Sequence, residues 1–281
     1  MKHISVLLVA SAISGLGASA AMAGPDFTAA IGAGPQTIDF ASVSGDGYGV
    51  YGLLSAANNF TPVLGAQGDL LVRYSHFESD GAEADIASLD AVLHAFYRDS
   101  ERFLVGGFAQ FGHDTLKNSS YEAGSNRYYV GAEGQVFLDQ FTGYGQVGWQ
   151  KTAPDDSDVY LEGWFITGEL RYFVTPDLKV EVHAGHKETT VNVPEAPELR
   201  TLNFGLGAEY RLPDLPFSVF GKYDYSTTSI ADWYSVDSHR VLVGLKFNLG
   251  DDSLQQRDRN GASLKPVDFG SNYEVGGIEI D

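Results

Sequence analysis

Pairs of serine, histidine and aspartate residues are the first places to look for chemistry, because a nucleophilic hydrolase needs these side chains within hydrogen-bond reach. Three adjacent pairs include a histidine, Ser75-His76, His113-Asp114 and Ser238-His239. Neighbouring residues of a strand point to opposite faces, so no pair can form directly if these segments are strands. His183 and His186 fall on opposite faces too, which argues against a shared metal site. The sequence therefore predicts no catalytic residue, no metal site and no cofactor.

Charged side chains form the second group that could do chemistry, because they recur at alternate positions of otherwise apolar segments. Alternation places them on one face of each segment. Carboxylates and basic groups are balanced among them, six of each beside two histidines, which predicts mutual ion pairing. The candidates are Arg73, Asp90, His94, Glu133, Glu169, Arg171, Lys179, Glu181, His183, Glu209, Arg211, Lys222, Asp224 and Lys246.

The composition narrows the classes of protein that could hold these residues. The chain has 281 residues, 37 acidic against 18 basic, and a formal net charge of -19. Nucleic acids are bound through clustered Lys and Arg, so a nucleic-acid partner is not expected. Aromatic residues make up 12% of the chain, which favours a folded protein over acidic disorder. Cysteine is absent, so disulfides cannot supply stability.

The N-terminus has the pattern of a secretory signal peptide. Lys2 precedes a mostly apolar stretch over residues 4–13, and small residues then lead to Ala21, Met22 and Ala23. This A-x-A ending is the form that signal peptidase cleaves. We therefore expect residues 1–23 to be removed and the mature chain to begin at Gly24.

From Thr37 to Leu249 the sequence repeats segments of about ten residues that alternate apolar with polar or small side chains. Residues 202–211 are the clearest example, and no stretch shows a convincing helical period. Tyr or Phe recurs at segment ends, as in Phe77 and Tyr172, and tight turns alternate with longer polar connections such as residues 114–125, 187–199 and 226–238. Both features are typical of a transmembrane β-barrel. The twelve segments begin near residues 37, 48, 68, 86, 103, 126, 141, 159, 178, 200, 217 and 239.

The last segment ends in Gly244, Leu245, Lys246 and Phe247. This ending resembles the Gly, apolar, any residue, aromatic ending of Gram-negative outer-membrane β-barrel proteins of the porin-like superfamily, without pointing to one family. The resemblance implies that the barrel assembly machinery reads Gly244, Leu245 and Phe247. It also implies a location in the cell outer membrane, contact with its lipid and periplasmic termini.

The predicted fold is all-β, an antiparallel up-and-down transmembrane β-barrel of about 12 strands, with 10 as the alternative. The expected organisation is a signal peptide over 1–23, an N-terminal periplasmic segment over 24–36, the barrel over 37–249 and a disordered periplasmic C-terminal tail over 250–281. Twelve tilted strands close at a backbone radius of roughly 12 Å, so side chains can largely fill the lumen.

The function predicted for such a barrel is a narrow passive porin-like channel for small solutes, not an enzyme. The alternative is a closed structural or surface-interaction barrel with a salt-bridged lumen, and a membrane-embedded hydrolase is a minor alternative.

One strand register can be predicted from charge, around the turn at residues 175–177. Partner numbers in an antiparallel pair sum to a constant, and a sum of 350 would set Arg171 opposite Lys179. A sum of 352 sets Arg171 opposite Glu181 and Glu169 opposite His183. Opposite charges stabilise a cross-strand pair, so we predict 352, with residues 174–178 forming the turn.

Overall fold

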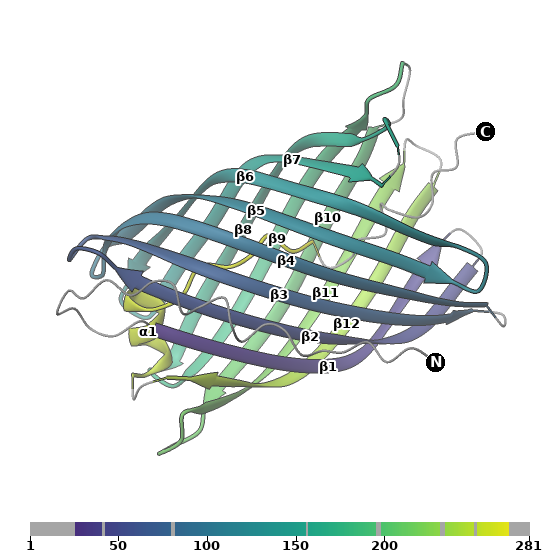
Figure 1. The fold of residues 1–281 in the computed structure, drawn as a ribbon. Helices are drawn as coiled ribbons and strands as arrows, with labels where there is room; N and C mark the ends of the chain where they lie inside the picture. Colours follow the sequence, from purple (N-terminus) through teal and green to yellow (C-terminus); the bar gives the residue numbers. More distant parts are fainter. Residues whose placement is uncertain are drawn as a thin grey trace.

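The chain forms a closed barrel of twelve antiparallel strands in which each strand pairs with its neighbour in sequence and β1 pairs with β12 (Figure 1). The structure is a computed structural model that describes residues 26–40, 43–79, 82–155, 157–194, 198–230, 234–249 and 252–269. The predicted all-β fold and the count of twelve strands are confirmed, and the ten-strand alternative is wrong. The expected signal peptide and its cleavage site lie outside the described residues.

The strands run for 14 to 18 residues, which is longer than the 9 to 11 that cross a bilayer, so their ends extend beyond it. Their bounds are β1 Asp26–Phe40, β2 Val43–Asn59, β3 Leu64–Ser79, β4 Ala82–Asp99, β5 Phe103–Asn118, β6 Glu122–Leu138, β7 Phe141–Pro154, β8 Leu161–Thr175, β9 Leu178–Val191, β10 Glu198–Arg211, β11 Phe217–Ile230 and β12 Tyr234–Asn248.

The first strand begins earlier than the sequence pattern suggested. Residues 26–36, expected to be part of a periplasmic segment, belong to β1 and pair with both β2 and β12. Small residues at Ala29, Ala30 and Gly32 hide the alternation there, and Pro35 resembles a strand break. Proline lacks the N–H needed for a ladder bond, and the β1–β12 pairing skips residues 34 and 35 before resuming at Gln36.

The connections expected to be long are mostly strand. β5 continues to Asn118 and β6 begins at Glu122, so only three residues separate them. The expected difference in length between the two ends of the barrel is therefore small among the described residues. The prediction assigned these residues to loops because they are polar. A strand end that projects past the membrane needs no apolar face, so polar residues can still form a strand there.

The hairpin between β8 and β9 has the predicted register. Arg171 lies opposite Glu181 and Glu169 lies opposite His183, so the sum of 352 is confirmed. The turn is tighter than predicted, because Thr175 still pairs with Leu178 across a bulge. Arg171 does not form its closest ion pair across the strands: its guanidinium lies 2.5 Å from Glu169 on the same strand. Charge matching thus accompanies this register without a direct ion pair.

The outer face of the barrel carries an apolar band between two aromatic girdles. On β5, β8 and β11, outward aromatic residues recur eight positions apart, which corresponds to ~20 Å along the barrel axis at the usual strand rise and tilt. Apolar side chains between them are exposed, and Val243 reaches 65%. Phe77 was expected in a girdle but is 6% exposed on the inner face. The outward pairs are Phe103 and Phe111, Trp164 and Tyr172, and Phe217 and Tyr225.

Replacing Val243 with Arg should destabilise the barrel by about 2–4 kcal/mol, because the side chain lies between the girdles and faces lipid. Ser235 is on the same face of β12, near its opposite end, and Ser235→Arg should cost only about 0–1 kcal/mol. Urea unfolding of the two variants in lipid vesicles measures the difference. Equal costs at both positions would contradict the assignment of the apolar band to the membrane.

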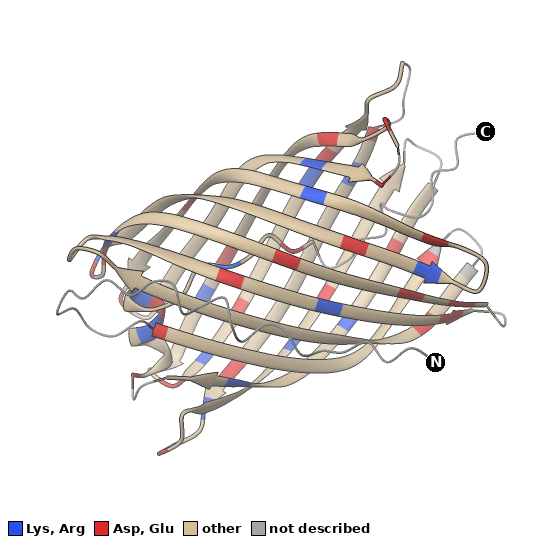
Figure 2. Ribbon diagram, viewed as in Figure 1, with Lys and Arg blue, Asp and Glu red and all other residues tan. Residues whose placement is uncertain are grey.

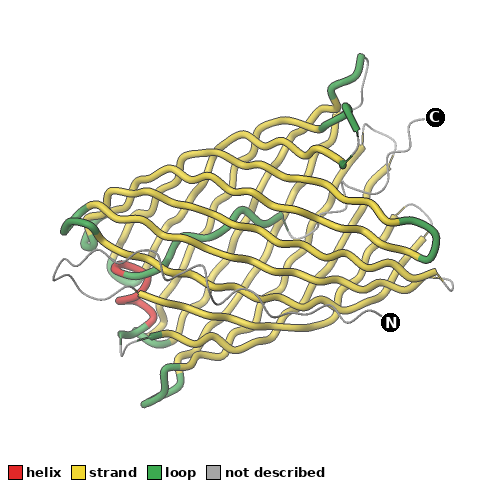
Figure 3. Tube along the Cα trace, in the orientation of Figure 1, coloured by secondary structure: helices red, strands yellow, loops and turns green. Residues whose placement is uncertain are grey.

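One short helix, α1 Leu254–Asn260, lies at the end of the barrel where β1 begins (Figure 1). Among the described residues, no helix has the length and apolar character needed to cross a bilayer. From α1 the chain continues as an irregular segment that runs among the strands (Figure 3). The expectation of a disordered tail is therefore wrong for residues 252–269.

Candidate functional site

The helix α1 covers the end of the barrel at which Asp139 and Pro176 lie in short turns between strands. Ser253 caps it in a capping box with Gln256. Gln255 donates from its backbone N–H to the carbonyl of Pro176 at 3.1 Å and from its side chain to the carbonyl of Asp139 at 2.7 Å. Arg257 pairs with Asp26 at the start of β1 at 3.2 Å. These contacts hold the helix against three separate places on the barrel rim.

Residues 254–269, which we call the plug segment, lead from this rim into the lumen. Leu264 packs in a cluster of wall residues that includes Phe137. Val267 and Phe269 pack in a second cluster that includes Phe165, whose side chain has 0% exposure. All three plug side chains are no more than 3% exposed. The apolar half of the lumen wall, contributed by β4 to β8, is thus covered by the protein's own C-terminal part.

Inward glutamines bind the backbone of the plug segment much as a neighbouring strand would. Gln67 on β3 donates to the carbonyl of Leu264 at 2.8 Å and accepts from its N–H at 3.2 Å. Gln110 on β5 accepts from the N–H of Val267 at 2.8 Å and donates to its carbonyl at 3.2 Å. Buried backbone groups must be paired, so these side chains make an irregular segment compatible with the lumen.

The charged side chains of the plug segment reach strands on different sides of the barrel. Asp258 pairs with Arg171 on β8 at 2.5 Å. Lys265 lies 2.7 Å from Glu169 on β8 and 3.0 Å from Glu181 on β9. Asp268 lies 2.6 Å from Arg73 on β3 and 3.2 Å from Arg240 on β12. Contacts all around the wall show that the segment occupies the lumen.

The wall groups that hold the plug also have partners within the wall. Arg171 pairs with Glu169, and Glu181 pairs with Lys179 at 2.9 Å. Arg73 binds Asp90 at 2.9 Å, and Arg240 binds Asp224 at 3.0 Å. Departure of the plug segment would therefore leave none of these four arginine and glutamate groups without an opposite charge nearby.

All fourteen charged candidates have low side-chain exposure. Thirteen join five wall networks, while Arg211 lies at the rim, 3.7 Å from Asp177. Figure 2 shows positions of both charges interspersed along the strands. One network joins Arg73 to Asp90, and a second places His94 between Glu133 at 2.7 Å and Asp69 at 2.9 Å. The other three lie along β8 to β12: Glu169 with Arg171, Lys179 and Lys246 with Glu181 and Glu209, and His183 and Lys222 with Asp224.

Several inward charged residues were not among the candidates, although the same alternation applies to them. They lie near the ends of strands that are longer than the sequence pattern predicted. Their odd or even position on each strand would have identified them as inward. No periodic signal identifies the charged residues of the plug. The missed wall residues are Asp69, Asp114, Arg127, Lys187 and Arg240, and the missed plug residues are Asp258, Lys265 and Asp268.

The adjacent serine, histidine and aspartate pairs are divided by the barrel wall. Ser75 bonds to inward Gln36 at 3.3 Å, while His76 bonds to Asp85 at 2.8 Å. Ser238 likewise bonds to Ser226 on the inner face, whereas the ring of His239 stacks on outward Tyr223. The geometry follows the alternation predicted for strands.

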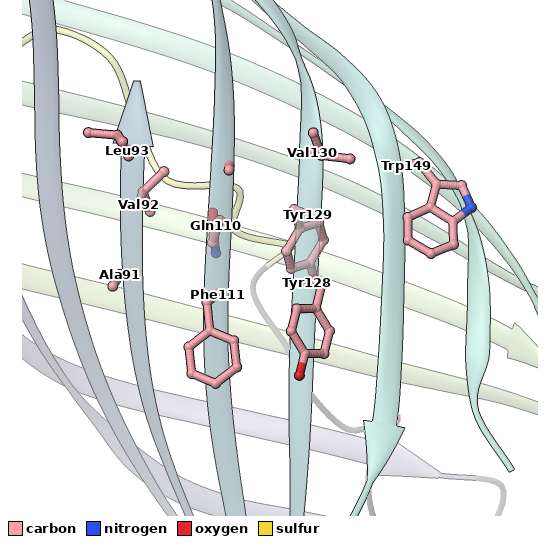
Figure 4. Close-up of a pocket in the computed structure, with 10 residues that line it drawn as sticks. Ala91, Val92, Leu93, Gln110, Phe111, Tyr128, Tyr129, Val130 and Trp149 are labelled. Carbon is pink, nitrogen blue, oxygen red and sulfur yellow. The ribbon is translucent and has the colours of Figure 1, made fainter. Parts of the chain in front are cut away.

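The barrel wall has a cavity on its inner face and a depression on its outer face. A cavity of about 100 Å³ lies between the plug segment and the charged strands, lined in part by Lys179, Glu209 and Lys246. It is large enough for about three waters. A shallow depression of about 450 Å³ lies over β4 to β7, where Phe111, Tyr128 and Trp149 project from neighbouring strands (Figure 4). The depression is bordered by girdle aromatics, so it faces lipid and not the lumen.

Solved outer-membrane proteins share this fold at low sequence identity. An outer-membrane channel from Pseudomonas putida F1 superposes with a TM-score of 0.61 at 10% identity, covering 80% of this chain and 95% of that one. The translocator domain of the autotransporter NalP from Neisseria meningitidis gives 0.52 at 16% identity, covering 80% and 88%. The β domain of the Bordetella autotransporter Brka gives 0.52 at 9% identity, covering 80% and 99%. No family model and no curated protein matches the chain.

The fold and the chemistry of the two faces agree. An apolar band bounded by aromatic girdles suits a bilayer, and the charged groups at the height of this band lie on the inner face, where lipid cannot reach them. The chain is a closed twelve-stranded β-barrel that shares its fold with solved outer-membrane β-barrel proteins.

Proposed function

We propose that the protein is a narrow channel for small solutes and that its plug segment closes the lumen in the state described here. The observation that carries the proposal is the double pairing of the wall. Arg73, Arg171, Arg240 and Glu181 each bind the plug, and each also has an opposite charge within the wall. A barrel whose lumen is permanently filled by the plug segment would not need this second set of partners within the wall.

The apolar contacts explain why the closed state is favoured at rest. Burial of Leu264, Val267 and Phe269 stabilises the docked plug by about 1.5–3 kcal/mol per side chain as an upper estimate. The ion pairs add less, because each wall charge exchanges one partner for another and for water. Opening therefore requires a force or a ligand that offsets the apolar term.

Deleting residues 250–281 tests the proposal. All twelve strands are complete at Asn248, so the chain ending at Leu249 should still form the barrel. In planar bilayers we expect the full chain to be mostly silent and the shortened chain to conduct steadily. The reversal potential in a salt gradient should stay near zero, because acidic and basic wall residues are nearly balanced. A shortened barrel that inserts but does not conduct would support the closed structural barrel instead.

A reversible staple provides the matched control on the full chain. The hydroxyl of Thr142 on β7 lies 2.6 Å from the carboxylate of Asp258. The native chain contains no cysteine that could form a competing disulfide. Thr142→Cys combined with Asp258→Cys should keep the channel silent when oxidised. Reduction should make openings more frequent than in the oxidised form, because only non-covalent contacts then hold the plug segment. Openings that ignore the redox state would show that the current does not pass through the plugged lumen.

A further inference from the structure

The tip of the plug segment sets two unlike groups against different parts of the lumen wall. The Asp268 carboxylate lies between Arg73 on β3 and Arg240 on β12. The next residue, Phe269, packs its ring edge-on against Phe165 on β8, with centroids 6.2 Å apart. In the closed barrel, β3 lies across from β8 and β9, and β12 lies midway between β3 and β9. An anion and an apolar ring are thus bound at the two ends of one short stretch.

Both half-sites belong to the wall and are built for these groups. Arg73 is 7% exposed, and its guanidinium nitrogens divide between Asp90 and Asp268. The ring of Phe269 lies over Gly185, where an added Cβ would come within 2.9 Å of the ring. Lys187 lies 5.0 Å above the same ring, in cation–π range. The absence of a side chain at Gly185 is what gives the ring its place.

We propose that this pair of half-sites is the solute-binding site of the lumen, and that it takes small carboxylates with an apolar aryl or alkyl body. Asp268 and Phe269 occupy it as an internal stand-in for such a solute. The proposal rests on the proposed channel function and deepens it, because a solute that binds here competes directly with the tip of the plug. Arg73 and Arg240 would hold the carboxylate, while Phe165, Gly185 and Lys187 would hold the body.

Binding to the full chain tests the site without relying on conductance. The probe is 4-phenylbutyrate, compared with butyrate, which lacks the ring, and with 4-phenylbutylamine, which reverses the charge. Asp268→Asn with Phe269→Ala empties the site and changes no wall residue. In titration calorimetry on the detergent-solubilised protein, we expect this variant to bind 4-phenylbutyrate at least about tenfold more tightly than the native chain, because the internal competitor is gone. Butyrate and the amine should bind weakly to both.

Two wall variants, each added to the emptied chain, separate the half-sites. Arg240→Gln should weaken the binding of 4-phenylbutyrate. Gly185→Val should also weaken it, because the added side chain fills the place of the ring, but should leave the weak binding of butyrate unchanged. Heat-modifiable migration in gels checks that each variant is folded. Equal binding of the acid and the amine, or no gain on emptying the site, would overturn the proposal. A shortened barrel that fails to conduct would instead count against the channel function. The calorimetric result would still test the binding site, because it does not depend on conductance.

Discussion

Replacing Phe247 with Asp is expected to remove the protein from the outer-membrane fraction. Phe247 lies near the end of the closing strand, where β12 pairs with both β1 and β11, and its ring packs against Phe217 at 5.4 Å. We propose that the barrel assembly machinery reads this residue together with Gly244 and Leu245. A carboxylate here would alter that ending and put a charge into an aromatic girdle.

Phe217→Asp is the matched control for this experiment. Phe217 is the same residue type, in the same girdle, on the neighbouring strand, and differs only in lying outside the closing strand. We expect Phe217→Asp to insert with reduced stability, whereas Phe247→Asp should accumulate outside the membrane. Cell fractionation with gel migration of unheated samples distinguishes the two. If both variants insert equally well, the ending of β12 does not serve as an assembly signal.

Replacing Asp90 with Asn is expected to destabilise the barrel by about 3 kcal/mol, because the change leaves buried arginines with less opposite charge. Asp90 is 0% exposed and accepts from Arg73 at 2.9 Å, from Arg127 at 3.1 Å and from Gln110 at 3.0 Å. Asparagine keeps the shape and some hydrogen bonds, so the loss reports the charge. Arg127 retains Asp114, which keeps the cost at the lower end of the range for a broken buried pair.

The control is the exposed pair of Lys117 and Glu122, whose side chains are 63% and 62% exposed. Glu122→Gln should change the free energy of unfolding by no more than about 1 kcal/mol. Both variants can be unfolded with urea in the same vesicles. A cost for Asp90→Asn as small as the control would mean that lumen water screens the network, contrary to the burial described here.

Alternation in the sequence was enough to predict the strands and the faces on which their residues lie. A strand has a period of two, and lipid excludes charge, so the parity of one charged residue assigns the whole strand. Matching of opposite charges across the strands, added to this alternation, correctly predicted that Arg171 lies opposite Glu181. Alternation failed where neither constraint acts: at the small residues of β1, and at strand ends that project beyond the membrane, such as those near Asn118 and Glu122.

The position of residues 252–269 was decided only by the tertiary structure. This segment is short, polar and without period, so its local sequence resembles a solvated tail. Its placement depends on partners more than a hundred residues away, such as Gln67 for Leu264 and Arg73 for Asp268. Those partners converge only once twelve strands have closed and created an interior with apolar patches, glutamines and charges at matching heights. The sequence by itself therefore determined a barrel with a charged lumen, and the closed barrel determined what fills it.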